Sequence, residues 1–479
     1  MAILPSPTFA LQPAAERVAL ETNYITTFDF LNQYLPDTYE KEFERYGNRT
    51  VSSFLRMVGA EMPSISDQVK WAEQGRLHIK YDNCTTTAAI NASTATFTVN
   101  TTNSLIASVA IRIGQTVFIQ NNTTGVSNKA VVTAVTQTGS STVAGTFTVA
   151  YYEAGGQTSA GTGVTFTVFI YGSEFRKGTV GMDGSLEAED TIFSNNPIIL
   201  KDRYAVNGSD MAQIGWVEVT TENGATGYLW YLKSEHETRL RFEDYIETAM
   251  IEAIPAASGS GAAGQGLKGS EGVFYVVNNR GNVWGGGTPT TLANWDEIVG
   301  RLDKQGAIEE NVVFVNRAFG FDIDNMLATL NGFSSTGSAN GASFGLFDND
   351  VEMALNLGFS GFRRGYDFYK SDWKYLNDPT MRGGLSTAST AVGSVTGLLV
   401  PAGSTTVYDQ IMGKNAKRPF LHVRYRASET EDRRFKTWIT GSAGGAATSN
   451  LDAMEVNFLS ERCVCTLGAN NFVLFRYGA

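Results

Sequence analysis

Residues that could carry chemistry are few in this chain. Cys463 and Cys465 are one residue apart, so a strand would place both thiols on one face, where they could bind a soft metal. A zinc site needs about four ligands, and no second pair stands at a suitable spacing. Buried, reduced thiols are therefore the favoured interpretation, and Cys84 leaves an odd, sparse set that argues against a disulfide framework.

The histidines are the next candidates for chemistry, and there are three of them. His78 and His422 lie in strand-like runs, and His236 lies in a helical one. An enzyme should show convergent titratable groups, and this chain offers few of them. We expect all three to be structural.

Two pairs of carboxylates could bind a cation, Asp322 with Asp324 and Asp348 with Asp350. Each pair falls where a helix is expected to begin, so N-capping and the helix dipole explain it more simply. The glycine-rich run 261–269 lacks the Gly-Lys-Ser/Thr ending of a phosphate loop, and no G-x-S-x-G elbow or zinc-protease helix occurs. The sequence predicts no catalytic residue, no metal site, no cofactor and no enzyme activity.

Composition sets the class of protein. The 479 residues suggest about three domains, 42% hydrophobic residues suffice for folded cores, and 50 glycines with only 18% charged residues favour strands and turns. A net charge of −11 without a cluster of Lys and Arg argues against a nucleic-acid reader. No signal peptide and no apolar run near 18 residues is found, so we expect cytoplasmic folding and no membrane contact.

The longest helical pattern runs over 228–254 and is the element that must position the rest. Its apolar residues recur at three- and four-residue steps, and the predicted rod is roughly 40 Å long. His236 and Arg239 interrupt the stripe. We expect the two ends of this helix to bury against different neighbours, so that it braces the parts on either side.

A second distinct region covers 83–172, where charged residues nearly disappear and alternating runs of Thr, Val and Ala predict a small all-β module of about six strands. The flanking segments, 74–82 and 174–178, resemble two arms of one interrupted hairpin. A strand is expected over 74–81. We interpret the module as an insertion in a loop of the parent fold.

Strand and helix patterns alternate after the long helix and predict a compact α/β region. The expected elements are strand 273–278, helix 294–304, strand 311–316, helix 321–330, helix 348–357 and a glycine-rich exit over 383–403. The predicted organisation is an N-terminal arm and first strand over 1–82, the inserted all-β domain over 83–172, an extended hairpin over 173–222, a spine helix with a first peripheral part over 223–290, an axial α/β domain over 291–418 and peripheral β ribbons over 419–479.

This order of parts resembles the major capsid protein of tailed bacteriophages, which has the Hong Kong 97-type capsid fold. The stretches VPAGSTTVYDQ, RPFLHVRYRASETEDRRFKTWITGSAGG, MEVNFLSERCVCTLGANNFVLFR and GYDFYKSDWKYLND look like those of crAss-like phages. The resemblance implies an α+β fold with an N-arm, an extended E-loop hairpin within 174–216 that reaches over a neighbour, a spine helix and an axial domain. No cleavable scaffolding domain is evident at the N-terminus, which departs from members that carry one.

The resemblance also implies a structural role. The chain would self-assemble as hexamers and pentamers into an icosahedral shell around double-stranded DNA, formed in the bacterial host cytoplasm and retained in the virion capsid. Its partners would be copies of itself, portal and auxiliary capsid proteins, and packaged DNA through weak, non-specific contact. Two alternatives remain open: a β-rich phage tail or receptor-binding protein that binds carbohydrate, and an encapsulin-like compartment shell.

Overall fold

The computed structural model divides the chain into two compact units, Met1–Thr50 and Val51–Ala479. The first unit lies outside the described residues, as do the expected helix 348–357 and the acidic pair Asp348 and Asp350. In the part that is described, no helix is long and apolar enough to cross a membrane. The structure describes residues 54, 60–99, 109–136, 145–159, 161–184, 190–211, 218–220, 226–330, 360–385, 393–402, 404–409, 414–443 and 447–478.

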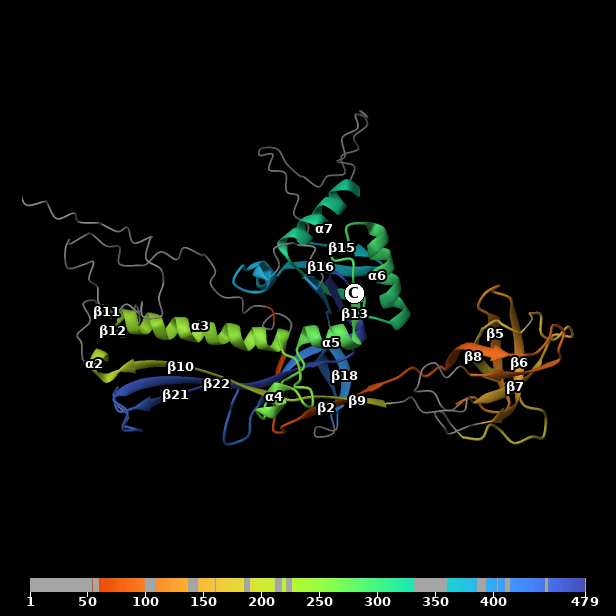
Figure 1. The fold of residues 1–479 in the computed structure, drawn as a ribbon, viewed down its shortest axis with the longest axis horizontal. Helices are drawn as coiled ribbons and strands as arrows, with labels where there is room; N and C mark the ends of the chain where they lie inside the picture. Colours follow the sequence, from red (N-terminus) through yellow and green to blue (C-terminus); the bar gives the residue numbers. More distant parts are fainter. Residues whose placement is uncertain are drawn as a thin grey trace, which may run out of the picture. The chain divides into compact units, whose positions relative to one another are not determined.

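The first sheet, which we call the ribbon sheet, contains the predicted C-terminal ribbons (Figure 1). The strand order is β1, β20, β22 and β10, and β21 pairs with the free side of β22. Only the β1–β20 pair is parallel. Its strands are β1 (Ala60–Ser64), β10 (Ile198–Asn207), β20 (Leu421–Arg426), β21 (Lys436–Gly441) and β22 (Ala453–Thr466).

The predicted long helix is confirmed as α3 (Leu229–Glu252), which lies along β10 and β22. Phe242 and Ile246 are buried against β22, where Phe458 lies 5.9 Å from the Phe242 ring centre. This apolar contact is what fixes the helix to the sheet, since an isolated helix has little stability in water. α3 is continuous through His236 and Arg239.

The second sheet, the mixed sheet, has the strand order β13, β23, β17, β14, β16, β15. Helices α6 and α7 confirm the helices predicted over 294–304 and 321–330, and β14 confirms the strand predicted over 311–316. The elements are α6 (Leu292–Gln305), α7 (Arg317–Leu330), β13 (Asn282–Trp284), β14 (Glu310–Val315), β15 (Gly361–Arg364), β16 (Tyr366–Asp372), β17 (Val395–Pro401) and β23 (Val473–Arg476).

Alternation along β14 assigns the two faces of the mixed sheet. Val313 and Val315 face the core shared with α6 and α7, which centres on the fully buried Trp295. Phe314 faces the opposite core, which also contains the end of α3 and strands β20 and β22. This second core joins the mixed sheet to the ribbon sheet, so the two sheets share one hydrophobic interior.

Three predictions about this region are wrong. Residues 273–278 form part of helix α5 (Val273–Arg280), not a strand. The run is short and apolar, and such a run fits a buried helix as well as a buried strand. The glycine-rich exit over 383–403 contains β17, a central strand with every residue buried. The final strand β23 pairs with β13 and β17 in the mixed sheet, so it does not continue the ribbons.

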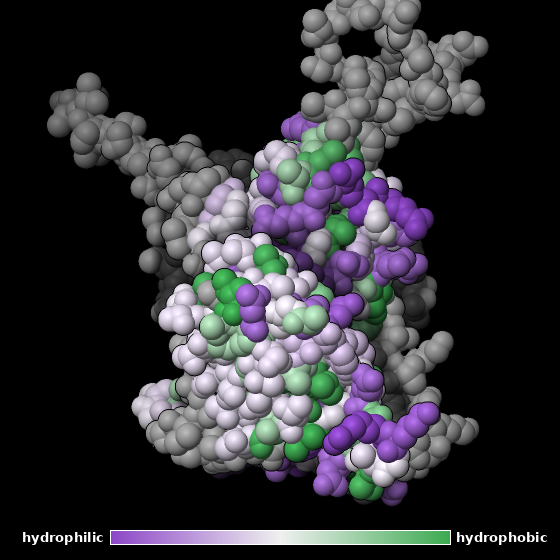
Figure 2. Space-filling model, turned by 90° about the vertical axis from the view of Figure 1, so that its right-hand side faces the viewer, coloured by the Kyte–Doolittle hydropathy of each residue, from purple (hydrophilic) through white to green (hydrophobic). Residues whose placement is uncertain are grey.

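The region predicted to be an all-β module forms a closed six-stranded barrel with the order β3, β4, β7, β6, β5, β8. Its core is built from small and aromatic residues, including Phe97, which stacks on Phe147 at 5.6 Å. The barrel face turned to the viewer in Figure 2 is mostly of intermediate hydropathy, as its threonine-rich sequence requires. The strands are β3 (Lys80–Thr86), β4 (Thr94–Thr98), β5 (Gln115–Asn121), β6 (Ser127–Thr136), β7 (Thr146–Tyr151) and β8 (Phe166–Ser173).

The two arms that flank the barrel are β2 (Val69–Gln74) and β9 (Asp190–Asn195), which pair antiparallel as a two-stranded ribbon. The predicted arms 74–82 and 174–178 are therefore the wrong residues. The strand predicted over 74–81 is also wrong. β2 ends at Gln74, residues 75–79 pair with no strand, and β3 begins at Lys80 as part of the barrel.

The extended hairpin expected within 174–216 is not formed by the described residues. β9 pairs with β2, and β10 pairs with β22 in the ribbon sheet. Between them lie Asn196 and Pro197; proline has no N–H to continue a ladder, so the chain changes partner here. The Asn207-Gly208 turn leads into a short helix instead of a return strand.

The remaining elements are short. They are α2 (Gly208–Met211), α4 (Gly261–Gly264), α8 (Lys374–Asn377), 3-10 turns at Arg382–Gly384 and Ala469–Asn471, and the strand pairs β11 (Glu218–Thr220) with β12 (Thr226–Tyr228) and β18 (Ser404–Asp409) with β19 (Lys414–Pro419).

The pairing of β2 with β9 gives a direct test of whether the barrel is a separable insertion. Gln74 stands opposite Asp190, so replacing residues 75–189 by a two-residue Asn-Gly turn should convert the ribbon into a simple hairpin. We expect the shortened chain to be soluble, with a midpoint of thermal unfolding within a few degrees of that of the full chain's main transition. Insoluble protein, or loss of the main transition in calorimetry, would contradict the insertion.

Candidate functional site: the α3 groove and the ribbon root

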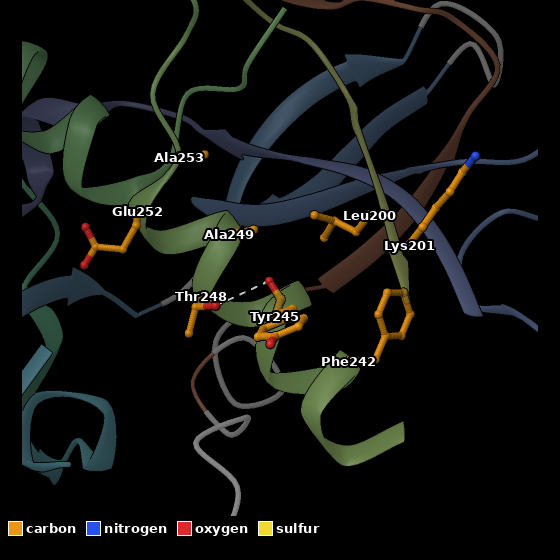
Figure 3. Close-up of a pocket in the computed structure, with 8 residues that line it drawn as sticks. All are labelled: Leu200, Lys201, Phe242, Tyr245, Thr248, Ala249, Glu252 and Ala253. Atoms are coloured by element: carbon orange, nitrogen blue, oxygen red, sulfur yellow. Dashed lines mark hydrogen bonds between the residues drawn. The ribbon is translucent and has the colours of Figure 1, made fainter. Parts of the chain in front are cut away.

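An open groove of about 460 Å³ runs between α3 and β10 (Figure 3). Leu200 extends from β10 toward Ala249 on the helix, and both belong to the apolar lining. Lys201 and Glu252 supply its charged groups. The lining residues are Leu200, Lys201, Phe242, Tyr245, Thr248, Ala249, Glu252 and Ala253. The groove has the chemistry of a binding surface for an apolar segment.

The groove exists because α3 overhangs the edge of the ribbon sheet. Phe242 and Ile246 face the sheet and are buried, but Tyr245, one residue away, keeps 48% of its surface exposed. In an α-helix Tyr245 and Ala249 lie four residues apart on one face. That face of the helix lies over Leu200 and Lys201 of β10, and Ala249 also packs against the core that joins the two sheets.

Strand β10 forms the floor of the groove and is the outermost strand of its sheet. In the described part of the chain it pairs only with β22, so its other edge is open. Farther along the strand, Asp202 accepts hydrogen bonds from Arg241 at 3.1 and 3.3 Å and from the N–H of Arg203 at 2.9 Å. These contacts fill the space between strand and helix, so the open stretch of the edge lies near Leu200.

The second candidate site is the root of the β2–β9 ribbon, where the side chain of Asn195 is buried and the residue is 2% exposed. Its Nδ2 donates to the carbonyls of Val464 at 2.6 Å and Glu271 at 3.0 Å. Its Oδ1 accepts from Ser270 Oγ at 3.0 Å and from the N–H groups of Glu271 and Asn196, both at 2.8 Å. One amide therefore ties the ribbon to β22 and to the segment before α5.

Arg280 at the end of α5 holds the ribbon from the side. Its guanidinium lies 4.2 Å from the ring centre of Phe193 on β9 and 5.8 Å from that of Trp71 on β2. The same group forms an ion pair with Glu271 at 2.8 Å. A guanidinium stacked on aromatic faces and paired with a carboxylate is partly desolvated, and such contacts contribute about 1–2 kcal/mol. The ribbon direction is set by Asn195 and Arg280 together.

Cys463, Cys465 and His422 are located in strands, as predicted, but His78 is not. Cys463 and Cys465 share one face of β22, are 0–1% exposed, and pack against Val69 of β2. The Cys463 thiol donates a hydrogen bond to the neighbouring Cys465, and this bond and burial both raise the pKa of Cys463, so that thiol stays protonated. His422 Nδ1 lies 3.3 Å from the carbonyl of Pro419. No group of three or more metal-ligating side chains occurs in the described residues.

The acidic pair on α7 is not an N-cap, which corrects the expectation. The helix begins at Arg317, four residues before the predicted start, and Asn316 Oδ1 accepts from the N–H of Phe319 at 2.8 Å as the cap. Asp324 forms an ion pair with Lys370 of β16 at 2.5 Å. Burial raises the pKa of Asp322.

Sequence reasoning proposed no site residues, so both the groove and Asn195 were missed. One signal was available for the groove: adding Tyr245 to the apolar stripe of the long helix makes the stripe wider than one sheet contact needs. Asn195 offers no such signal, because its five partners are distant in sequence or ordinary backbone groups. Asn-Asn-Pro reads only as a turn.

Comparison with solved structures finds distant matches among viral and compartment shells. A chain from Microbacterium phage Oxtober96 matches at 9% identity and a TM-score of 0.40, and the match covers 95% of this chain and 99% of that one. The capsid of the native GTA particle matches at 9% identity and a TM-score of 0.39, over 96% of this chain and 100% of that one. The holo-SrpI encapsulin complex from Synechococcus elongatus PCC 7942 matches at 10% identity and a TM-score of 0.30, over 62% of this chain and 77% of that one.

No protein-family model matches the sequence, and no curated protein matches it. A likeness at these TM-scores does not assign a function. The function proposed below is therefore inferred from the surfaces of this chain and from the resemblance of its C-terminal stretches.

Proposed function

We propose that this chain is the major capsid protein of a tailed phage, and that it self-assembles into an icosahedral shell around double-stranded DNA. The observation that carries the proposal is the α3 groove, an apolar helix face beside the outer edge of β10, which no other strand of the described part of the chain covers. An open edge of this kind is ordinarily covered or blocked in a monomeric protein. Here the simplest cover is another copy of the chain.

The β2–β9 ribbon supports the same proposal. A two-stranded ribbon is at best marginally stable alone, and this one exposes Ile192 at 69%. Ile65, just before β2, is 77% exposed. Large apolar side chains on a thin projecting element are typical of contact surfaces. We assign the role of the extended hairpin to β2 and β9, with the barrel inserted between them.

The energetics of a shell suit contacts of this size. Each interface in a closed lattice can be modest, because a subunit leaves only when several contacts break together. The mixed sheet is assigned to the capsomer axes, and α3 with the ribbon sheet to the periphery. Expansion of the shell would repack these bodies, with α3 bending near His236 and Arg239. A helix that stays straight in every copy of the particle would contradict that bend.

The proposed partners follow from charge and surface. Copies of the chain form hexamers and pentamers, and portal and auxiliary capsid proteins complete the shell in the host cytoplasm. The net charge of −11 keeps contact with packaged DNA weak and non-specific, because binding to phosphate requires cationic side chains. The barrel is proposed to strengthen contacts between capsomers or to receive an auxiliary protein.

The assembly state of the purified full chain tests the function. Sedimentation velocity and negative-stain electron microscopy should show shells, sheets or isolated capsomers. A single species of monomers or trimers across a wide range of protein concentration would contradict the proposal and favour a tail or receptor-binding protein. Nucleic acid in the particles, read by the ratio of absorbance at 260 and 280 nm, distinguishes a genome shell from an enzyme compartment.

Charge placed in the groove should block assembly without unfolding the protein. We expect Tyr245→Asp to lower the fraction of protein in particles at least about tenfold, because an unpaired carboxylate would be buried at the contact. The matched control is Tyr171→Asp on the barrel, since the two tyrosines are 48% and 49% exposed. Equal assembly of both variants, measured by sedimentation, would remove the groove from the interface.

A further inference from the structure

We propose that the barrel carries a binding site for a neutral polysaccharide on the outer face of β5 and β8. The inference goes beyond the proposed function and does not depend on it. Among the described residues, the barrel has a hydrophobic core of its own and adds no side chain to the other cores, so its surface is free to serve a separate role. The site, which we call the aromatic face, consists of Phe118, Tyr152, Phe169 and Tyr171.

The aromatic face departs from the outward pattern found elsewhere on the barrel. On β4 and β7 the outward residues include Thr96 and Thr148, whose hydroxyls bond each other at 2.9 Å. β5 and β8 lie side by side in the same barrel (Figure 1), and there the paired outward residues are Phe118 and Phe169. Their ring centres are 5.0 Å apart. A cluster of rings on a surface, unlike a single exposed ring, is typical of a binding site.

Two tyrosines extend this cluster. Tyr171 follows Phe169 by two residues on β8 and is 49% exposed, whereas Ile170 between them packs against the barrel core. Tyr152 is 47% exposed, and its hydroxyl donates to Glu174 Oε2 at 2.6 Å, which fixes the direction of its ring. Burial, the bond to Glu174 and the nearby Tyr171 all raise the pKa of Tyr152, so the two tyrosines are neighbours on this surface.

Polar groups border the rings. Across the strands the register runs in the order Lys80, Phe169, Phe118 and Lys129, so a lysine stands on each side of the phenylalanine pair. The N–H of Tyr152 donates to the carbonyl of Lys129 at 3.2 Å, which places this tyrosine beside the same lysine. A pyranose ring has a face of C–H groups and a rim of hydroxyls. The negative face of an aromatic ring attracts such C–H groups, and the bordering polar groups can bond the hydroxyls.

Charge decides which class of polymer fits the aromatic face. The segment 80–175 contains three cationic side chains and three carboxylates, so its formal charge is zero. These six residues are Lys80, Asp82, Arg112, Lys129, Glu153 and Glu174. One of the two bordering lysines, Lys80, is paired with Asp82 at 2.9 Å. A nucleic acid or an anionic glycan requires clustered cationic side chains, whereas a neutral polysaccharide does not.

The size of the aromatic face separates a polysaccharide from a protein partner. An aromatic side chain has an area of about 200 Å², so the three residues exposed at 39–49% present roughly 300 Å². A stable protein interface buries about 800 Å² on each partner. An oligosaccharide needs less, because one sugar unit can stack on each ring. The threonine face on β4 and β7 stays available for contacts within a shell.

Retention of the full chain on immobilised oligosaccharides tests the site. The neutral probes are cellohexaose, mannohexaose, maltohexaose and chitohexaose, and the anionic controls are a heparin fragment and an oligothymidylate. We expect the unassembled chain to bind at least one neutral probe and neither anionic control. Particles should bind that probe at least about a hundredfold more tightly, because they would present the face once per subunit.

Substitutions within the aromatic face make the test specific. Tyr171→Ala and Phe169→Ala should each weaken binding at least about tenfold, because each removes a stacking surface. Tyr171→Phe keeps the ring and should retain most of the binding. The matched control is Tyr369→Ala, whose tyrosine is 53% exposed on the mixed sheet, and it should leave binding unchanged. Thermal unfolding within a few degrees of the unmodified chain will show that each variant is folded.

Four outcomes would overturn the inference. They are no retention on any neutral probe, equal retention of Tyr171→Ala and the unmodified chain, retention on the anionic probes alone, and binding that disappears when the chain assembles. The last would make the aromatic face a contact between copies. The first three use the unassembled chain and stand whether or not particles form, so failure of the proposed function is read separately by sedimentation.

Discussion

Replacing Phe54 by alanine should lower the free energy of unfolding by about 3–5 kcal/mol, the usual cost of removing a buried phenylalanine ring. The ring is 1% exposed, stacks on Trp373 with centres 4.5 Å apart, and meets Phe314 edge to face at 4.7 Å. It belongs to the core that joins the two sheets. The loss therefore leaves a cavity where α3, β14 and α8 meet, and these elements cannot collapse independently.

Urea unfolding of the unassembled protein, followed by tryptophan fluorescence, measures this effect. Trp373 touches the substituted ring and should report the transition directly. The control is Phe321→Ala on α7, where the ring is 57% exposed, and it should cost less than about 1 kcal/mol. Similar costs for the two variants would mean that Phe54 does not anchor its segment in the core.

The second large effect is expected at the ribbon root. Asn195→Ala should destabilise the protein by about 3 kcal/mol, because a buried partner left without a hydrogen bond costs about 1–3 kcal/mol and several are left here. The Ser270 hydroxyl is 1% exposed and would lose its acceptor, and the carbonyl of Val464 would lose its donor. The effect should appear both in urea unfolding and as faster hydrogen exchange in β9.

Two further variants make this prediction specific. Asn195→Asp keeps the acceptor oxygen but places a carboxylate 2.6–3.0 Å from the carbonyls of Val464 and Glu271, so it should be at least as damaging as alanine. Asn122→Ala removes an amide that bonds Thr165 and Thr167 on the exposed barrel surface, and it should cost less than about 1 kcal/mol. If all three variants unfold alike, Asn195 is not the tie that the geometry indicates.

Elements with strong local periodicity were predictable. The α3 and α6 helices and the C-terminal strands follow from spacing within one segment, and the barrel from alternation and composition over one region. The strand predicted where α5 lies was wrong because five apolar residues in a row suit either a helix or a strand. Flanking turns did not decide between them.

Pairing between distant strands was not predictable in the same way. β2 and β9 are separated by the whole barrel, and β10 finds its partner in β22, about 250 residues later. Pro197 signals that a ladder ends but not which strand comes next. The candidate groove depends on this pairing, since it is the open side of β10 that gives Tyr245 its exposed position.

The adjacency of Gln74 and Asp190 has a practical consequence for engineering. The chain leaves and re-enters the ribbon at two positions held side by side, about 5 Å apart in a ladder of this kind. Any foreign domain whose own termini lie close together can be spliced between them without straining the parent fold. In the proposed shell, that cargo would be presented once per subunit, at a density set by the lattice and not by chemical conjugation.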